Sequence, residues 1–260
     1  MNRIDERFAK VKADGRKALI TFLTVGDPNM EVSEKAIYTM QEEGVDLIEL
    51  GVPFSDPAAD GPVIQRADER ALAQGVDIFK VFELVRKIRN NVEVPMVFLL
   101  YYNVMVQYGI EKFFKRCQET GVDGLIIPDL PYEESDEIKE YTEKYGVYQI
   151  SLVSPTSKDR IKNIAKDAKG FLYCISSLGV TGEKSSFVTN FDEFVGTIKK
   201  YTDVPACVGF GVSNGRQVKE LTKYFDGAIV GSAIVKSIAT GESVEERINN
   251  LRAKIKDLKS

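Results

Sequence analysis

Two carboxylates stand eleven positions apart in the segment ELGVPFSDPAADGP, residues 49–62, where proton chemistry could take place. Glu49 lies near the end of a short apolar run, residues 47–50, of the kind expected for a buried strand. Its neighbours Ile48 and Leu50 are apolar, and alternation along a strand places Glu49 on the opposite face. If that face is the interior of a barrel, burial raises the pKa of the carboxyl, which suits a general acid/base near neutral pH. The alternative is a structural, ion-paired glutamate.

Asp60 is the second candidate catalytic carboxylate. Prolines restrict the backbone of the loop that carries it, and this would hold its side chain in one place; they are Pro53, Pro57 and Pro62. The alternative is a turn aspartate or an N-cap for the helix expected after the loop. Asp56 is interpreted as structural or interfacial. Asp129, which closes the fourth apolar run, is a weaker site candidate whose role stays open.

The other residue types limit the chemistry further. The chain contains no histidine, and its three cysteines are scattered without a CxxC pair, which disfavours a zinc site, although carboxylate-bound magnesium stays open. No predicted strand ends in a lysine that could form a Schiff base. A C–C bond would therefore break only in a substrate that supplies its own electron sink. An indole does so, because protonation at C3 gives a cationic imine.

Charge and hydropathy exclude two classes of partner. The net charge is −4 with a pI near 5.3, and no basic stripe suggests nucleic acid. The longest apolar run, about 96–102, is far shorter than the ~20 residues that a membrane helix needs. The N-terminus lacks the apolar core of a signal peptide, and we expect a cytoplasmic protein.

Short apolar runs alternate with amphipathic stretches along the whole chain. The predicted strands are 19–24, 47–50, 96–100, 124–127, 147–152, 171–175, 206–208 and 228–230. The predicted helices between them are 31–43, 77–90, 110–119, 133–144, 158–166, 191–200 and 215–223. A Gly-Val-Asp sequence recurs at 44–46 and 121–123, with a variant at 225–227.

This pattern predicts an α/β fold, a single (β/α)8 TIM barrel domain over residues 1–260. An extra N-terminal helix, residues 3–12, would plug the bottom of the barrel, and a second extra helix, 63–73, would follow the second strand. An open doubly wound sheet is the alternative. In a barrel the active site lies at the carboxyl ends of the strands, and so Glu49 and Asp60 would lie at that end. Phe22, Leu99, Tyr101 and Ile126 would form an apolar, aromatic wall there.

Three glycine-rich loops follow the last three predicted strands, at residues 178–182, 209–214 and 231–234. Small residues let backbone N–H groups approach an anion, and a helix that begins just beyond adds its positive end. Residues 232–239 could be the short extra helix that often completes a phosphate site in barrels. We therefore predict phosphate binding; the alternative is that the glycines only shape tight turns.

The segment 49–62 closely resembles the signature of the tryptophan synthase alpha chain family. Further segments look like motifs of the same family, in family order, and together they span essentially the whole chain. They are Thr24-Val25-Gly26-Asp27-Pro28, Tyr101-Tyr102-Asn103, Gly179-Val180-Thr181-Gly182, Gly209-Phe210-Gly211-Val212-Ser213 and Gly231-Ser232-Ala233-Ile234-Val235.

The resemblance implies a lyase of tryptophan biosynthesis that cleaves indole-3-glycerol phosphate to indole and glyceraldehyde 3-phosphate in a retro-aldol reaction. It implies that Glu49 protonates indole C3 and that Asp60 accepts the indole N–H and stabilises the cation. Tyr173 would lie near the site, and Thr181 would help to close it. Phosphate would be held by Gly182, Gly211, Gly231 and Ser232, and the indole would pack on Phe22, Leu99 and Ile126.

The resemblance also implies a partner, a pyridoxal-phosphate-dependent beta chain in an alpha2-beta2 type heterotetramer, whereas this chain would need no cofactor or metal. Ser177 departs from relatives that carry arginine in this part of the loop, and the order and closure of residues 177–189 stay open. Activity without the beta chain and the oligomeric state of the isolated chain also stay open. Two other functions remain as alternatives: a phosphate-binding sugar isomerase or epimerase, and a non-catalytic subunit that only activates a partner.

Overall fold

The structure is a computed structural model that describes residues 1–157, 159–175, 190–209 and 211–260. Within these residues, parallel strands form one sheet in the order β5-β4-β3-β2-β1-β9-β8-β7-β6. Their bounds are β1 Ala18–Thr24, β2 Leu47–Gly51, β3 Met96–Leu99, β4 Gly124–Ile126, β5 Tyr148–Gln149, β6 Ser151–Val153, β7 Leu172–Ile175, β8 Ala206–Gly209 and β9 Gly227–Val230.

The predicted fifth strand is divided into β5 and β6, which are separated by Ile150 alone. β5 pairs with β4 and β6 pairs with β7, while the N–H of Ile150 donates to the carbonyl of Leu125 at 2.8 Å. The strand therefore changes partner at this residue and links the two edges of the sheet. The nine strands occupy eight positions around a nearly closed barrel, which confirms the (β/α)8 prediction and shows that the open doubly wound alternative is wrong.

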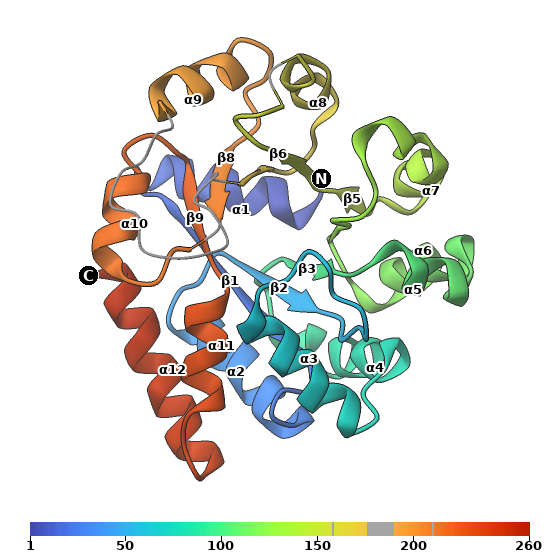
Figure 1. Cartoon of the computed structure of the whole chain (residues 1–260), viewed down its shortest axis with the longest axis vertical. Helices are drawn as coiled ribbons and strands as arrows, with labels where there is room; N and C mark the ends of the chain where they lie inside the picture. Colours follow the sequence, from blue (N-terminus) through green and yellow to red (C-terminus); the bar gives the residue numbers. More distant parts are fainter. Residues whose placement is uncertain (158, 176–189, 210) are drawn as a thin grey trace.

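Helices surround the barrel (Figure 1). Their bounds are α1 Arg3–Ala13, α2 Met30–Glu42, α3 Pro62–Ala73, α4 Ile78–Ile88, α5 Tyr102–Tyr108, α6 Ile110–Thr120, α7 Asp136–Tyr145, α8 Ile161–Asp167, α9 Phe191–Lys199, α10 Gly215–Leu221, α11 Ser232–Ala239 and α12 Val244–Lys259, with short 3-10 turns η1 Arg89–Asn91 and η2 Tyr132–Glu134. Lys158, the first residue of the predicted helix 158–166, lies outside the described residues.

Two of these helices were missed from the sequence. α5 is a short, aromatic-rich helix, and its first N–H group, that of Tyr102, donates to both carboxylate oxygens of Asp129 at 2.9 and 3.1 Å. α12 follows the last strand and buries only Leu251, Ile255 and Leu258, packing against α2, α10 and α11. α12 is thus the outer helix of the eighth unit, whereas α11 is the extra helix that the sequence predicted.

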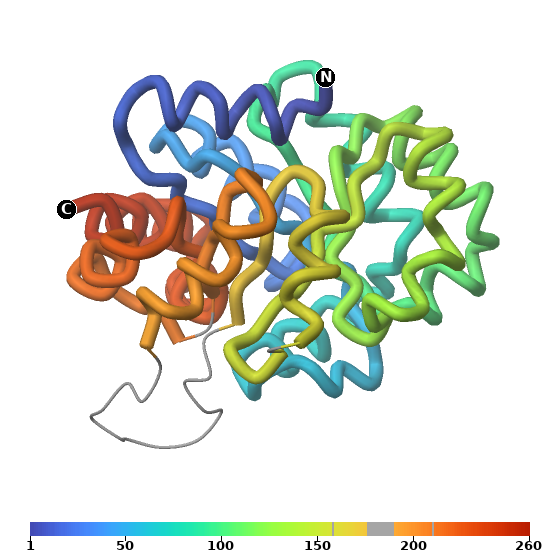
Figure 2. Tube along the Cα trace, turned by 90° about the horizontal axis from the view of Figure 1, so that it is seen from above, coloured from blue at the N-terminus to red at the C-terminus, as the bar shows by residue number. Residues whose placement is uncertain are grey.

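The predicted extra helices α1 and α3 lie at opposite ends of the barrel. In Figure 2, α1 is the dark blue helix at the top and α3 lies in the cyan segment at the bottom. α1 presents Ile4, Phe8 and Val11 to the barrel interior, where they join a buried cluster that includes Ile20 and Leu47. This is the plug that the sequence predicted. At the other end, α3 and α11 lie side by side (Figure 1).

A repeated polar link joins neighbouring strands at the end that α1 covers. Asp46, Asp123 and Asp226 each come directly before a strand. Each accepts a backbone N–H from the start of the strand one unit earlier: Leu19 at 3.0 Å, Met96 at 2.8 Å and Ala206 at 2.9 Å respectively. Each also donates its own N–H to the carbonyl of that same residue, at 2.8, 2.9 and 2.8 Å. We call this two-way link an aspartate clasp.

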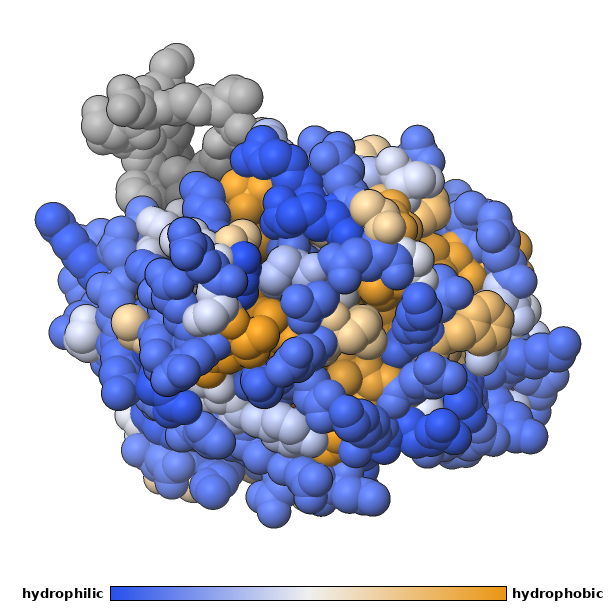
Figure 3. Space-filling model, turned by 90° about the horizontal axis from the view of Figure 1, so that it is seen from below, coloured by the Kyte–Doolittle hydropathy of each residue, from blue (hydrophilic) through white to orange (hydrophobic). Residues whose placement is uncertain are grey.

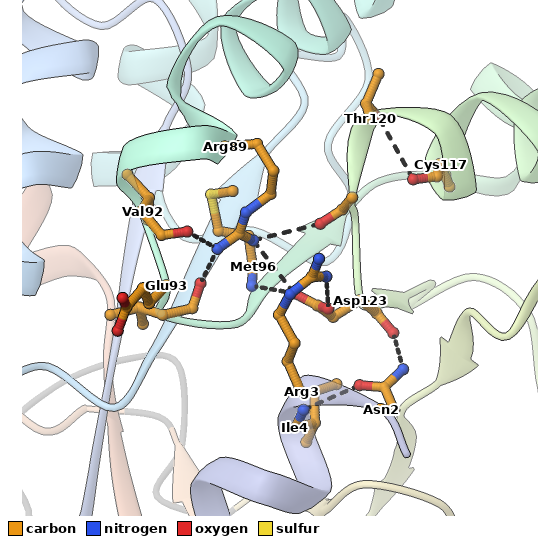
Figure 4. Close-up of polar contacts among 12 residues, drawn as sticks. Asn2, Arg3, Ile4, Arg89, Val92, Glu93, Met96, Cys117, Thr120 and Asp123 are labelled. Atoms are coloured by element: carbon orange, nitrogen blue, oxygen red, sulfur yellow. Dashed lines mark hydrogen bonds and ion pairs between the residues drawn. The ribbon is translucent and has the colours of Figure 1, made fainter.

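A basic side chain neutralises each clasp. Arg16 binds Asp46 through both terminal nitrogens at 2.7 Å, and Lys199 lies 2.7 Å from Asp226. Around Asp123, Arg3 of α1 and Arg89 of η1 converge on the carboxylate at 2.7 and 3.5 Å (Figure 4). The two buried carboxylates of this set, Asp46 and Asp123, are therefore both paired with arginines.

One face of the molecule shows how hydrophilic and hydrophobic residues are distributed on its surface. In Figure 3, hydrophilic side chains cover most of the face and interrupt the hydrophobic areas. Among the described residues, no helix combines the length and apolar character that a membrane crossing requires.

Candidate active site

A cavity of about 830 Å³ opens at the carboxyl ends of the strands. Glu49 and Asp60 both line it, although they come from β2 and from the loop after it. Side chains of β1, β3, β4 and β7 form the wall, and residues after β8 and β9 form another part. The predicted residues that line it are Phe22, Glu49, Asp60, Leu99, Ile126, Tyr173, Gly211, Gly231 and Ser232.

Glu49 has a buried carboxyl group, and no hydrogen bond from a described residue offsets the loss of its hydration. Its side chain is fully enclosed, and among the described residues neither of its oxygens has a hydrogen-bond partner. Burial therefore raises the pKa of Glu49 from its ordinary 4.5 to about 8. The group carries a proton at neutral pH and can donate it, which is the property required of a general acid.

Asp60 is held by Tyr101 rather than used as a helix cap. The Tyr101 hydroxyl donates to Oδ2 of Asp60 at 2.8 Å and accepts the backbone N–H of Ala59 at 2.9 Å. Burial raises the pKa of Asp60, while this hydrogen bond acts to lower it. The N-cap of α3 is Gly61, and so the N-cap alternative for Asp60 is wrong. Tyr101, predicted as part of the wall, is buried and reaches the site through Asp60; its ring also stacks on Phe54 at 4.9 Å.

A third buried carboxyl stands nearby. Asp68 of α3 is almost fully enclosed, and burial together with the negative charges of Asp60 and Asp27 raises its pKa to about 8. Asp27 contributes less to this rise than Asp60, and Arg70 binds both of its oxygens at 2.7 and 2.9 Å. Asp68 was not predicted as a site residue, because it lies in the middle of a helical pattern.

The aromatic wall depends on glycines in two strands. A Cβ on Gly51 would come within 2.5 Å of the Phe22 ring, and one on Gly209 would come within 2.5 Å of the Tyr173 hydroxyl. Only glycine leaves room for these rings inside the barrel. Burial, and to a smaller extent the neighbouring carboxyl groups of Glu49 and Asp60, raises the pKa of Tyr173, so the phenol keeps its proton.

Small residues form the part of the cavity that follows β8 and β9. Gly211 adopts φ +79°, a conformation that favours glycine, and apart from its chain neighbours no atom of the described residues lies within 4 Å of where its Cβ would be. Gly231 is the N-cap residue of α11 and Ser232 is its first residue, so helix N–H groups are available at this wall. Such a wall suits an anion. Thr181 and Gly182, predicted for the same role, and Ser177 lie outside the described residues.

The remaining predicted acids lie elsewhere. Asp129 is exposed and caps α5, which gives it a structural role instead of a place in the cavity. Asp56 is also exposed and accepts the hydroxyl of Ser55 at 2.6 Å.

Several lining residues were missed because they come from helices. Lys236, Ser237 and Thr240 belong to α11 and the residue after it, while Asn250 and Lys254 belong to α12. Their place at the cavity depends on how these helices pack, which a linear pattern does not encode. In the parts of the chain that the structure describes, no group of three or more histidine, cysteine or acidic residues could hold a metal ion.

Comparisons with known proteins agree with one another. A sequence model of the family described as Tryptophan synthase alpha chain matches residues 8–260. A tryptophan synthase alpha chain from Thermoanaerobacter sp. (strain X514) is 48% identical over 100% of this chain and 99% of its own. A solved tryptophan synthase subunit alpha from Campylobacter jejuni is 39% identical with a TM-score of 0.84, covering 93% of this chain and 95% of that one. A chain of Mycobacterium tuberculosis tryptophan synthase is 35% identical with a TM-score of 0.89, covering 99% and 96%.

Proposed function

The chain belongs to the tryptophan synthase alpha chain family, and from that premise we propose which of its residues perform the family's reaction. The protein is a carbon–carbon lyase of tryptophan biosynthesis that cleaves indole-3-glycerol phosphate to indole and glyceraldehyde 3-phosphate. Family membership displaces the isomerase and non-catalytic alternatives. The single observation that carries the assignment of roles is the fully buried carboxyl of Glu49, whose oxygens have no hydrogen-bond partner among the described residues.

The first step is protonation of the indole ring. The Glu49 carboxyl gives its proton to C3, the electron pair of the C2=C3 bond forms the new C–H bond, and a positive charge develops at the ring nitrogen. Asp60 accepts a hydrogen bond from the N–H and stabilises this charge. The hydrogen bond from Tyr101 supports that role, because it favours the ionised form of Asp60.

The second step breaks the C–C bond. The hydroxyl on the side-chain carbon attached to C3 loses its proton to Glu49, which is now a carboxylate. The O–H electrons form the aldehyde C=O, and the electrons of the C–C bond return to the ring and neutralise the imine. Indole and glyceraldehyde 3-phosphate result, and Glu49 recovers its proton, so one residue serves as acid and then as base.

The rest of the cavity binds the two ends of the substrate. Phe22, Leu99 and Ile126 would pack against the indole, and Tyr173 would lie beside the reacting carbons. Gly211, Gly231 and Ser232, together with Gly182, would hold the phosphate, and Thr181 would help to close the site. The cavity lining supports the assignments that fall on described residues.

We also propose the setting in which the chain works. The partner is a tryptophan synthase beta chain in an alpha2-beta2 assembly, and pyridoxal phosphate belongs to that partner, whereas this chain uses no cofactor. The names of the relatives support the partner. Residues 1–260 act as one barrel domain, which the continuous strand order supports, and the protein is cytoplasmic.

The decisive experiment replaces Glu49 by glutamine and follows release of glyceraldehyde 3-phosphate, with and without a beta chain. We expect kcat to fall by about 10²- to 10⁴-fold, which is the usual contribution of a general acid/base, with little change in KM. Circular dichroism checks that the variant is folded. Glu83→Gln, on the exposed face of α4, is the matched control and should keep full activity. A folded Glu49→Gln protein with wild-type turnover would sink the mechanism.

A further inference from the structure

The cavity continues beyond Ser232 along α11, where two lysines, Lys236 and Lys254, line it. We propose that Lys236 determines specificity for a phosphorylated substrate: its ammonium pairs with the phosphomonoester dianion that Gly231 and Ser232 face. This inference rests on the proposed function, since it takes the wall after β8 and β9 as the phosphate end. The proposal adds a charged side chain, from the second turn of α11, to the backbone N–H groups of that wall.

The helix geometry directs Lys236 towards that end. Lys236 follows Ser232 by four residues, so both side chains lie on one face of α11, about 5–6 Å apart at Cβ. Side chains in a helix lean towards its N-terminus, which here is the Gly231–Ser232 end. The lysine stem therefore extends from the second turn of α11 back over the first, and both residues line the same cavity.

The charged residues around the cavity indicate that the Lys236 ammonium, and not that of Lys254, is available to bind a phosphate. The acidic lining residues, Glu49 and Asp60, come from β2 and its following loop, while the basic ones come from α11 and α12. Lys254 is already engaged, with Asp257 Oδ2 at 2.9 Å and the Ser213 carbonyl at 3.4 Å. Among the described residues, no hydrogen bond or ion pair involves the Lys236 ammonium. Its positive charge is uncompensated and can meet an incoming dianion.

The experiment compares Lys236→Met, which keeps the stem and removes the charge, with Lys236→Arg, which keeps the charge. Both are assayed in complex with the beta chain. We expect Lys236→Met to raise KM for indole-3-glycerol phosphate by about tenfold to a hundredfold, the usual effect of losing one charge-assisted hydrogen bond, with kcat within about threefold. Lys236→Arg should recover most of the affinity. Added salt should raise KM for the wild type and much less for Lys236→Met, because the lysine is exposed.

Two binding measurements separate a role at the phosphate from a general structural role. Glycerol 3-phosphate, titrated calorimetrically, should bind Lys236→Met more weakly by the same factor, whereas indole should bind both proteins equally. Lys256→Met, which removes an exposed charge from α12 outside the cavity, is the matched control and should change neither value.

The outcomes distinguish this inference from the proposed function. The inference would be overturned if Lys236→Met had an unchanged KM and an unchanged affinity for glycerol 3-phosphate. If the wild type turned over normally in the same assay, the lyase assignment would remain intact. Equal weakening of indole and glycerol 3-phosphate would also overturn it, since that points to a distorted site. A wild type that releases no glyceraldehyde 3-phosphate would instead contradict the proposed function.

Discussion

Buried carboxylates at the two ends of the barrel are treated in opposite ways. At the end that α1 covers, Asp123 is 3% exposed, accepts the Met96 N–H and lies beside Arg3 and Arg89. At the carboxyl end of the strands, Glu49 is 0% exposed, and no described residue offers its oxygens a hydrogen bond. Burial raises the pKa of both groups, but only Asp123 has the N–H and the arginines that act against the rise.

The difference shows how one barrel separates stability from chemistry. A buried, paired carboxylate fixes the arrangement of strands and has no spare capacity to exchange a proton. A buried, unpaired carboxyl lowers the stability of the fold. The same loss of hydration raises its pKa, and this enables it to act as an acid near neutral pH. If the two ends divide stability and chemistry in this way, substitutions at each end should change different properties of the protein.

The largest expected effect on stability is that of Asp123→Ala. It leaves Arg89 unpaired with a side chain only 10% exposed and leaves the Met96 N–H without its acceptor. We expect the free energy of unfolding, measured by urea titration, to fall by about 3–5 kcal/mol, as for other broken buried ion pairs. The kcat of the folded fraction should stay within about threefold of the wild type.

An exposed aspartate provides the control. Asp136 has a side chain that is 89% exposed and lies 3.8 Å from Lys139, and Asp136→Ala should change stability by no more than about 0.5 kcal/mol. A loss of less than about 1 kcal/mol in Asp123→Ala would contradict a stabilising role for this end. A folded Asp123→Ala protein without activity would contradict the division of work.

Glu49→Gln should raise the free energy of unfolding, by less than Asp123→Ala lowers it. Below about pH 4.5 the carboxyl is protonated in both the folded and the unfolded chain, and so pH has no effect there. Between 4.5 and about 8 the unfolded chain loses the proton that folded Glu49 keeps, so the wild type loses stability as pH rises. Removing this group should stabilise the protein by roughly 1–3 kcal/mol at pH 8, after allowing for the unsatisfied glutamine amide, and much less at pH 5.

Urea titrations of Glu49→Gln and wild type at the two pH values measure this gain. The prediction is that this gain is larger at pH 8 than at pH 5. An equal gain at both pH values would mean that Glu49 does not hold a proton in the folded protein, and the contrast between the two ends would then lose its basis.

The smallest expected effect is that of Tyr101→Phe, which removes the hydroxyl that donates to Asp60 and keeps the ring that stacks on Phe54. Loss of one hydrogen bond of about 1 kcal/mol should lower kcat severalfold. Because this hydrogen bond lowers the pKa of Asp60, its removal should move the acidic limb of the pH–rate profile to higher pH. The alkaline limb, set by Glu49 near pH 8, should not move. A uniformly lower profile with both limbs in place would assign Tyr101 to substrate packing instead of to Asp60.

The sequence predicted the parts of the site that strands determine. Glu49 was identified because alternation between Ile48 and Leu50 gives its direction, and Asp60 because prolines fix its loop. The hydrogen bond from Tyr101 to Asp60 and the place of Asp68 beside Asp60 were not predictable in the same way, since each depends on contacts between elements that are separate in the chain.

The fold shows the same limit. Strand positions followed from apolar runs, but the division of the fifth strand at Ile150 arises from a change of partner that no local pattern records. α5 combines strand-forming aromatic residues with a cap supplied by Asp129 from another loop. α12 is mostly polar, with a narrow buried stripe, and its packing surface is provided by α2, α10 and α11.

The aspartate clasps also have a consequence for the order of folding. They join residues that are 27, 27 and 20 positions apart, a short loop for a barrel of 260 residues. Closing so short a loop loses little chain entropy, and each clasp needs only one strand, one crossover segment and the start of the next strand. Strand register can therefore be set unit by unit, before Ile150 joins the two edges and encloses the site.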